Sequence, residues 1–157
     1  MSDRILFVCL GNICRSPTAE GVFRQRAAAA GLSLSLIDSA GTASWHVGKA
    51  PDARTVKAAA GRGYDLSTLR ARQVSVADFN AFDFILAMDE QNLAELQSIQ
   101  PAQSLAELGL FLDYAEGAVE REVPDPYYGG DQGFQTVLDL IENASDGLIR
   151  RLRGTGS

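Results

Sequence analysis

The chain has 157 residues, of which 46% are hydrophobic and 22% charged, and its formal net charge at pH 7 is −6. This length predicts a single domain, 1–157, with a core of its own. The negative charge argues against nucleic acid or an anionic membrane as the main partner, because both are bound through clustered Lys and Arg. No apolar run approaches the ~20 residues of a membrane-spanning helix, and the apolar stretch near the start is too short for a signal peptide. We therefore expect a cytoplasmic protein.

Strand and helix patterns alternate in the first half of the chain. Residues 4–10, RILFVCL, form a nearly continuous apolar run, which is typical of a strand buried on both faces. Ser16 and Pro17 are residue types preferred at a helix start, and Gly31 at a helix end, so we expect a helix over 17–30. The further elements expected in this half are a strand over 34–38, a loop over 41–48 and a helix over 51–62.

The alternation continues in the second half. Residues 82–88, FDFILAM, predict another buried strand, and acidic residues favour a helix start in 89–97. Residues 105–112 fit either a fourth strand or a short helix. Residues 122–130, EVPDPYYGG, are too rich in Pro and Gly for regular structure, and apolar residues at helical spacing predict a last helix over 133–153. This order of elements predicts an α/β domain with a parallel sheet.

Residues 8–17, VCLGNICRSP, connect the first strand to the first helix. Ligands of parallel sheets bind beyond the carboxyl ends of the strands, where this loop is expected. Its backbone N–H groups and the helix dipole favour a bound anion, and Gly11 and Asn12 tolerate the left-handed backbone of a tight curl. Arg15 adds a planar, bidentate donor that suits phosphate, and Ser16 could cap the helix and also donate a hydrogen bond into the loop.

The chain has two cysteines, and both lie in this loop. Features that attract a phosphate also favour a thiolate, so we predict that Cys9 is a nucleophile facing a bound phosphoryl group. An isolated cysteine at a strand end could instead be a small buried hydrophobe. The five residues between Cys9 and Arg15 let the loop turn once and bring the guanidinium over the sulfur, which favours the nucleophile.

VCLGNICRSP resembles the active-site loop of the low-molecular-weight protein tyrosine phosphatases. Other segments match that family in order and spacing, so that the resemblance covers almost the whole chain: DSAGTASWHVGKAPD at 38–52, ARQVS at 71–75, FDFILAMDEQNL at 82–93 and VPDPYYGG at 123–130. The resemblance implies a three-layer α/β/α fold around a four-stranded parallel sheet, Rossmann-like or flavodoxin-like. It also implies hydrolysis of phosphotyrosine and aryl phosphates through a phosphocysteine, with no metal and no cofactor.

The same resemblance assigns roles to individual residues. Cys9 would take the phosphoryl group, while Arg15 and the backbone amides of 10–15 hold its oxygens. Asp125 would protonate the leaving group and then activate water, although an Asp beside Pro is commonly only a turn residue. The residues expected to bind the phosphate and the substrate are Leu10, Gly11, Asn12, Ile13, Cys14, Ser16, Trp45, Tyr127 and Tyr128.

Supporting roles are expected around the loop. Asn12 and Ser39 match family positions that organise the loop, and Ser16 matches the hydroxyl that stabilises the leaving thiolate, although such residues can also simply cap backbone groups. Asp89 and Asn92 could either join this network or cap the helix that follows.

The aromatic residues predict the substrate class. Trp45, Tyr127 and Tyr128 match an aromatic rim that would flank a phenol, although Trp45 could also be a packing anchor. Ile13 resembles the tyrosine-specific members, whereas protein-arginine phosphatases of this fold tend to carry Thr there. The expected partners are tyrosine-phosphorylated proteins, including a bacterial tyrosine kinase, and the chain is expected to be a monomer or to self-associate weakly.

Cys14 matches a family cysteine that pairs with the nucleophile under oxidation, although it could also be a small residue that fits the loop. Three alternative functions were considered: a protein-arginine phosphatase, an arsenate reductase and a phosphotyrosine-binding module. Arsenate reductases of this fold pass oxidation along three thiols, and no cysteine follows Cys14. A binding module would lack Cys9, Arg15 or Asp125, and all three are present.

Overall fold

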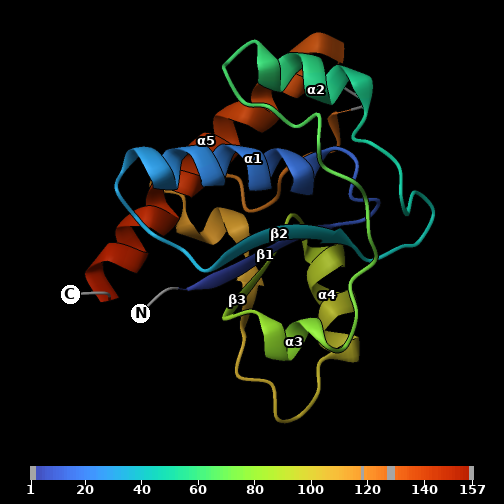
Figure 1. Cartoon of the computed structure of the whole chain (residues 1–157), viewed down its shortest axis with the longest axis vertical. Helices are drawn as coiled ribbons and strands as arrows, with labels where there is room; N and C mark the ends of the chain where they lie inside the picture. Colours follow the sequence, from blue (N-terminus) through green and yellow to red (C-terminus); the bar gives the residue numbers. More distant parts are fainter. Residues whose placement is uncertain (1–2, 118, 127–129, 156–157) are drawn as a thin grey trace.

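The computed structural model describes residues 3–117, 119–126 and 130–155 (Figure 1). A parallel sheet of four strands, in the order β2-β1-β3-β4, forms the centre of the molecule. The expected α/β fold is therefore confirmed. The strands are β1 (Arg4–Cys9), β2 (Leu36–Gly41), β3 (Phe84–Ala87) and β4 (Glu107–Leu110).

Helices cover both faces of the sheet, which gives the three expected layers. Alternate residues of β1 point to opposite faces, as the pleat of a strand requires. Ile5 and Phe7 join one apolar core cluster, and Leu6 and Val8 join the other. The first cluster is covered by α1 (Arg15–Ala29), α2 (Ala53–Ala60) and α5 (Gly130–Thr155), and the second by α3 (Asp78–Ala81) and α4 (Glu90–Ile99).

The apolar core extends across all three layers. The ring of Phe7 makes edge contacts with Phe23 of α1, at 5.6 Å between centroids, and with Phe111, at 4.9 Å. Phe111 begins η1 (Phe111–Tyr114), a short 3₁₀ helix directly after β4. Residues 105–112 therefore hold both a strand and the start of a helix, which are the two structures that their pattern allowed. No helix in the described part of the chain is long and apolar enough to cross a membrane.

Two expected boundaries near the loop were wrong. The first helix begins at Arg15 rather than Pro17, and its N-cap residue is Cys14, with no side-chain cap. Ser16 does not cap the helix, because its hydroxyl lies against the sulfur of Cys9 instead. The second strand begins later than expected and continues to Gly41, so that Cys9 and Gly41 stand opposite each other at the carboxyl edge of the sheet.

Candidate active site

Residues 9–15 form a tight loop between β1 and α1, and we call this loop the cradle. Asn12 has φ of 56°, the left-handed conformation expected of a tight curl, and its backbone N–H lies 3.3 Å from Cys9 Sγ. Backbone bonds tie the cradle to the chain after β2, since Thr42 N donates to Cys9 O and Ala43 N to Leu10 O, each at 2.9 Å. A Cβ at Gly41 would lie 2.7 Å from Leu10 O, so only glycine fits beside the cradle.

The sulfur of Cys9 is nearly enclosed, with 3% of the residue exposed, and it lies 3.0 Å from Ser16 Oγ. Asn12 Nδ2 donates to the same Ser16 oxygen at 2.8 Å. That bond leaves the hydroxyl proton of Ser16 for the sulfur, at 3.0 Å, or for Ala40 O, at 3.4 Å. A thiolate at Cys9 can therefore accept hydrogen bonds from the Asn12 backbone and from the Ser16 hydroxyl.

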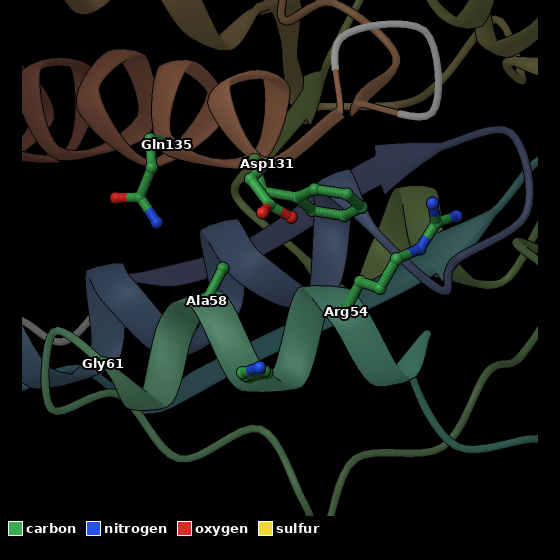
Figure 2. A pocket seen from close by; sticks show the side chains of 7 residues that line it. Arg54, Ala58, Gly61, Asp131 and Gln135 are labelled. Carbon is green, nitrogen blue, oxygen red and sulfur yellow. The ribbon is translucent and has the colours of Figure 1, made fainter.

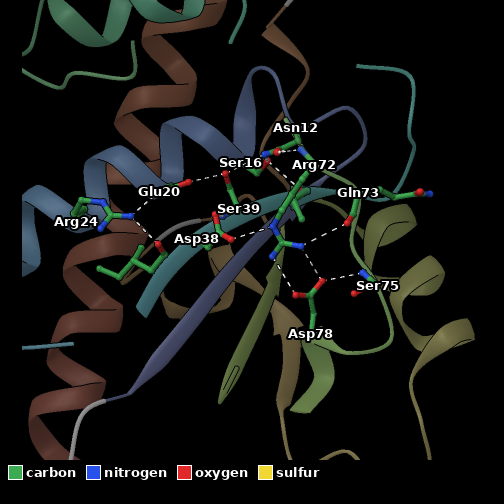
Figure 3. Close-up of polar contacts among 12 residues, drawn as sticks. Asn12, Ser16, Glu20, Arg24, Asp38, Ser39, Arg72, Gln73, Ser75 and Asp78 are labelled. Atoms are coloured by element: carbon green, nitrogen blue, oxygen red, sulfur yellow. Dashed lines mark hydrogen bonds and ion pairs between the residues drawn. The ribbon is translucent and has the colours of Figure 1, made fainter. Parts of the chain in front are cut away.

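A polar network extends from the cradle along α1, between this helix and β2 (Figure 3). Asn12 Nδ2 also donates to Ser39 Oγ at 3.0 Å, and Ser39 donates in turn to Glu20 Oε1 at 2.7 Å. Glu20 Oε2 accepts from Arg24 at 2.7 Å. Burial raises the pKa of Glu20, and the hydrogen bonds from Ser39 and Arg24 offset only part of that rise. The expected supporting position of Ser39 is present, whereas Glu20 was not predicted.

Arg72 fixes the other side of Asn12 (Figure 3). Its backbone N–H donates to Asn12 Oδ1 at 3.0 Å, and its guanidinium bonds to Asp38 at 3.0 Å and to Asp78 at 3.1 Å. The chain after Arg72 continues along β2, since Val74 N donates to Gly41 O at 2.8 Å. The segment ARQVS at 71–75 thus supports the cradle from outside.

Arg15 is buried, and its guanidinium is held from two sides. Nη1 donates to Asp89 Oδ2 at 2.7 Å and to the backbone oxygen of Val123 at 3.1 Å. Burial alone would lower the pKa of Arg15, but the nearby charges of Cys9, Asp89 and Asp125 raise it. The guanidinium is therefore a permanent cation beside the sulfur.

Asp89 performs both of the tasks that its sequence context left open. One carboxylate oxygen binds Arg15, and the other, Oδ1, accepts from Asn92 N at 2.7 Å and so caps α4. The same carboxylate thus connects Arg15 to a helix on the opposite face of the sheet.

Asp125 reaches the cradle from the other end of the chain. Val123, two residues earlier, accepts from Arg15 and donates its N–H to Met88 O at 2.8 Å, which fixes the start of the segment. Asp125 is solvent-exposed and lines the cavity that contains Cys9. A Cβ at Gly133 of α5 would lie 2.8 Å from Pro126 O, so helix and segment are in close contact.

A cavity of about 110 Å³ opens above the sulfur and gathers the predicted reactive groups. Its lining residues are Cys9, Leu10, Gly11, Ile13, Cys14, Arg15, Trp45, His46 and Asp125. Asn12, Ser16 and Ser39 lie behind it, in the polar network. Tyr127 and Tyr128 lie outside the described residues. The structure therefore brings together the thiol of Cys9, the backbone of the cradle, the Arg15 cation and an exposed carboxylate.

A separate hollow of about 330 Å³ lies between α2 and the start of α5 (Figure 2). It shares none of its described lining residues with the cavity at Cys9. Arg54 lies over the ring of Phe134, with the guanidinium carbon 5.2 Å from the ring centroid. This contact joins α2 to α5. In the chain, α2 comes after the loop that contains Trp45.

The family described as low molecular weight phosphotyrosine protein phosphatase matches residues 4–156. The chain belongs to this family. The chain is similar to a low molecular weight phosphotyrosine protein phosphatase from Schizosaccharomyces pombe. The two are 49% identical over 151 residues, which cover 95% of this chain and 96% of that protein.

Solved structures of relatives share the complete fold. A protein tyrosine phosphatase from Entamoeba histolytica is 42% identical, with a TM-score of 0.93, and the match covers 99% of this chain and all of that one. DARP, a Drosophila arginine phosphatase, is 30% identical, with a TM-score of 0.89 over 96% of this chain and 98% of that one. Solved structures with this fold are thus named both as tyrosine phosphatases and as an arginine phosphatase.

Proposed function

We propose that this protein hydrolyses phosphotyrosine in proteins, and aryl phosphates, through a phosphocysteine on Cys9. The observation that carries the proposal is the single cavity lined by Cys9, Arg15 and Asp125. A phosphate in this cavity would meet the amides of the cradle and the guanidinium, which are the donors that stabilise a phosphoryl group in transfer.

In the first step, Cys9 Sγ attacks phosphorus and the bond from phosphorus to the phenolic oxygen breaks. Asp125 gives its proton to the departing oxygen. Arg15 and the cradle amides hold the three remaining oxygens, where charge is concentrated. The products of this step are a tyrosine side chain and a phosphocysteine.

In the second step, water attacks the phosphocysteine and Asp125 takes the proton of that water. The bond between sulfur and phosphorus breaks, and inorganic phosphate leaves. The leaving thiolate then accepts hydrogen bonds from Ser16 Oγ, 3.0 Å away, and from Asn12 N, 3.3 Å away. These two donors stabilise the negative charge that the sulfur recovers.

The rim of the cavity favours an aromatic substrate. Trp45 is 69% exposed beside the cradle and offers a face on which a phenol ring can stack. Ile13 adds an aliphatic wall and brings no hydroxyl to the cavity. This supports tyrosine over arginine as the phosphorylated residue, although the similarity to the Drosophila arginine phosphatase keeps phosphoarginine as the second candidate. Tyrosine-phosphorylated proteins, including an autophosphorylating bacterial tyrosine kinase, are the proposed partners. The proposed enzyme is cytoplasmic, and it is a monomer or self-associates weakly.

The experiment compares wild type, Cys9→Ser and Asp125→Ala on p-nitrophenyl phosphate, a phosphotyrosine peptide and a phosphoarginine peptide under reducing conditions. We expect no turnover by Cys9→Ser and a loss of roughly 10²–10⁴-fold by Asp125→Ala on phosphotyrosine. The loss should be smaller on p-nitrophenyl phosphate, because nitrophenolate is a weaker base and leaves with less help from an acid. Equal losses on both substrates would remove Asp125 from the first proton transfer. Faster turnover of phosphoarginine would overturn the assignment to tyrosine.

Cys14 supports a second proposal about the same site. Both cysteines are buried, and both line the cavity. A disulfide between Cys9 and Cys14 would protect the nucleophile from further oxidation. Peroxide treatment followed by mass spectrometry should yield this disulfide and activity that returns with dithiothreitol. Irreversible inactivation of wild type at the same rate as Cys14→Ala would contradict it.

A further inference from the structure

A second, larger groove begins where the catalytic cavity ends. It has a volume of about 640 Å³, within the ~300–1,000 Å³ usual for ligand sites. Leu10 and Trp45 line both this groove and the cavity at Cys9, so the two hollows are continuous at the rim. The groove is lined by Leu10, Thr42, Ala43, Trp45, Gln73, Val74, Ser75, Val76, Gln91, Glu95, Ser98 and Ile99. We call it the flanking groove.

The walls of the flanking groove are fixed to the cradle by backbone bonds. The segment 73–76 is joined to the end of β2, because Val74 N donates to Gly41 O at 2.8 Å and Gln73 Nε2 to Thr42 O at 3.2 Å. Ser75 N is held by Asp78 at 2.8 Å (Figure 3). The groove is therefore a preformed surface whose position relative to Cys9 is set by the sheet.

The opposite wall is one side of α4. Gln91, Glu95, Ser98 and Ile99 are spaced three or four residues apart or adjacent at the helix end, so they share a face. The start of α4 is capped by Asp89, which also holds Arg15. One wall is thus anchored to the end of β2, and the other to the carboxylate that holds Arg15.

Large apolar side chains stand open to solvent along this groove. Trp45 is 69% exposed, Val76 55% and Ile99 40%. Among the described residues that line the groove, Glu95 is the one charged side chain. A third hollow, of about 380 Å³, meets the groove at Leu10 and Gln91. It adds the exposed acids Glu122 and Asp125, while the one cation among its described lining residues, Arg15, is buried and paired with Asp89. The surface is therefore apolar with an acidic border, which suits a neutral or basic apolar segment and repels an acidic one.

We propose that the flanking groove binds an apolar side chain of the substrate protein that lies within about three residues of the phosphotyrosine, and that it disfavours acidic residues there. This inference rests on the proposed function. An extended peptide advances roughly 3.3 Å per residue, so a side chain close to the phosphotyrosine in sequence would enter the groove at Leu10 and Trp45. The groove is continuous with the catalytic cavity, and its border is acidic. Both features favour a segment of the substrate protein as the occupant.

The test uses three phosphotyrosine peptides that differ only in the flanking residues, which are Leu, Lys or Asp on both sides. Their kcat/KM values are measured with wild type, Val76→Lys and Val76→Glu, and p-nitrophenyl phosphate is measured in parallel. The matched control is Leu105→Lys. Leu105 is 96% exposed and precedes the amino end of β4, at the edge of the sheet opposite the cradle.

We expect wild type to favour the Leu peptide over the Asp peptide by about fivefold, the effect of partly burying one apolar side chain. Val76→Lys should raise kcat/KM for the Asp peptide by about threefold to fivefold. Val76→Glu should raise kcat/KM for the Lys peptide by the same factor. Turnover of p-nitrophenyl phosphate should stay unchanged in all variants, and Leu105→Lys should keep the wild-type order of peptides.

Several outcomes would overturn the proposal. The proposal fails if wild type and both Val76 variants show the same peptide preference while all three still hydrolyse p-nitrophenyl phosphate. If wild type hydrolyses none of the substrates, the proposed function itself has failed, and the two failures are therefore distinguishable. Light scattering identifies another occupant: a wild-type dimer that Val76→Lys converts to a monomer would make the groove a contact between copies of this chain.

Discussion

Arg15 Nη1 and Asp89 Oδ2 lie 2.7 Å apart, and this ion pair holds the guanidinium beside the sulfur of Cys9. In the described part of the chain, both hydrogen bonds of the guanidinium use Nη1, which leaves Nε and Nη2 to face a phosphate. In the mechanism that we propose, the pair therefore positions Arg15 for phosphate binding and leaves room for a bound substrate.

Asp89→Asn should separate the two tasks of Asp89. Asparagine is also a good helix cap, so the cap of α4 is kept, and the free energy of unfolding should fall only by the about 1.5–3 kcal/mol that the lost ion pair with the buried Arg15 contributed. Loss of the charged partner should lower kcat/KM for p-nitrophenyl phosphate about tenfold, the effect of one charge-assisted hydrogen bond. Asp89→Ala should show the same kinetic loss and in addition lose about 1 kcal/mol of stability in urea denaturation. Wild-type kinetics in both variants would show that Arg15 needs no anchor.

Ser16→Ala should slow the second step more than the first. The hydroxyl lies 3.0 Å from the sulfur and stabilises the thiolate that leaves the phosphocysteine. We therefore expect kcat to fall about 10-fold or more, with a smaller fall in kcat/KM and a burst of phenol release in stopped-flow measurements. Thr18→Val is the matched control, because the Thr18 hydroxyl donates to Cys14 O at 2.7 Å, within the same helix start. A burst of the same size in both variants would exclude a special role for Ser16.

Asn12 combines a left-handed backbone with a side chain that makes three hydrogen bonds. Asn12→Gly removes the bonds but tolerates φ of 56°, whereas Asn12→Ala removes the bonds and adds strain. Urea denaturation should therefore find the glycine variant about 1 kcal/mol more stable than the alanine variant. Equal stabilities would mean that the cradle relaxes to a different backbone once the bonds are lost.

Glu20 should make stability depend on pH in a direction unusual for a carboxylate. Burial raises the pKa of Glu20 from its ordinary 4.5, so the folded state binds the proton more tightly than the unfolded state. That contribution to stability is fully present below the ordinary value and is lost as pH rises through the raised pKa. Glu20→Gln cannot ionise, so its stability relative to wild type should increase as pH rises from about 4 to about 7 in urea denaturation.

For Asp83→Asn we expect the opposite dependence of stability on pH. The hydrogen bond from the Arg4 side chain lowers the pKa of Asp83 from its ordinary 3.8. Its contribution is present above the ordinary value and is lost as pH falls through the lowered one. The asparagine variant should be the less stable protein at neutral pH and approach wild type in acid. Trends of the same sign in the two variants would contradict the assignment.

The cradle could be predicted from the sequence because its functional groups are contiguous. Cys9 to Ser16 stand between an apolar strand and a helix, and the placement of such a loop at the carboxyl edge of a parallel sheet follows from chain order. Besides the bounds of the second strand, the helix start was wrong. Ser16 is a residue type that caps helices, yet the helix begins one residue earlier and the hydroxyl serves the sulfur.

The polar network behind the cradle could not be predicted because its members meet only through the tertiary structure. Glu20 and Arg24 have the i, i+4 spacing of an ordinary surface pair. Glu20 is buried because β2 continues beyond its apolar start and places Ser39 opposite Phe7 of β1. Nothing in the local pattern of 34–41 marks that extension, since Asp38 and Ser39 interrupt the apolar run.

The cradle attracts anions, but the chain around it has a net charge of −6. Asp89, Glu122 and Asp125 line the adjoining hollow at its mouth. A phosphorylated partner therefore approaches against a repulsive field and is attracted only over the last few ångströms. Salt screens charges separated by more than about 8–10 Å and leaves the close contacts largely intact. Moderate salt should thus accelerate association, the reverse of what electrostatic steering gives a basic anion-binding protein.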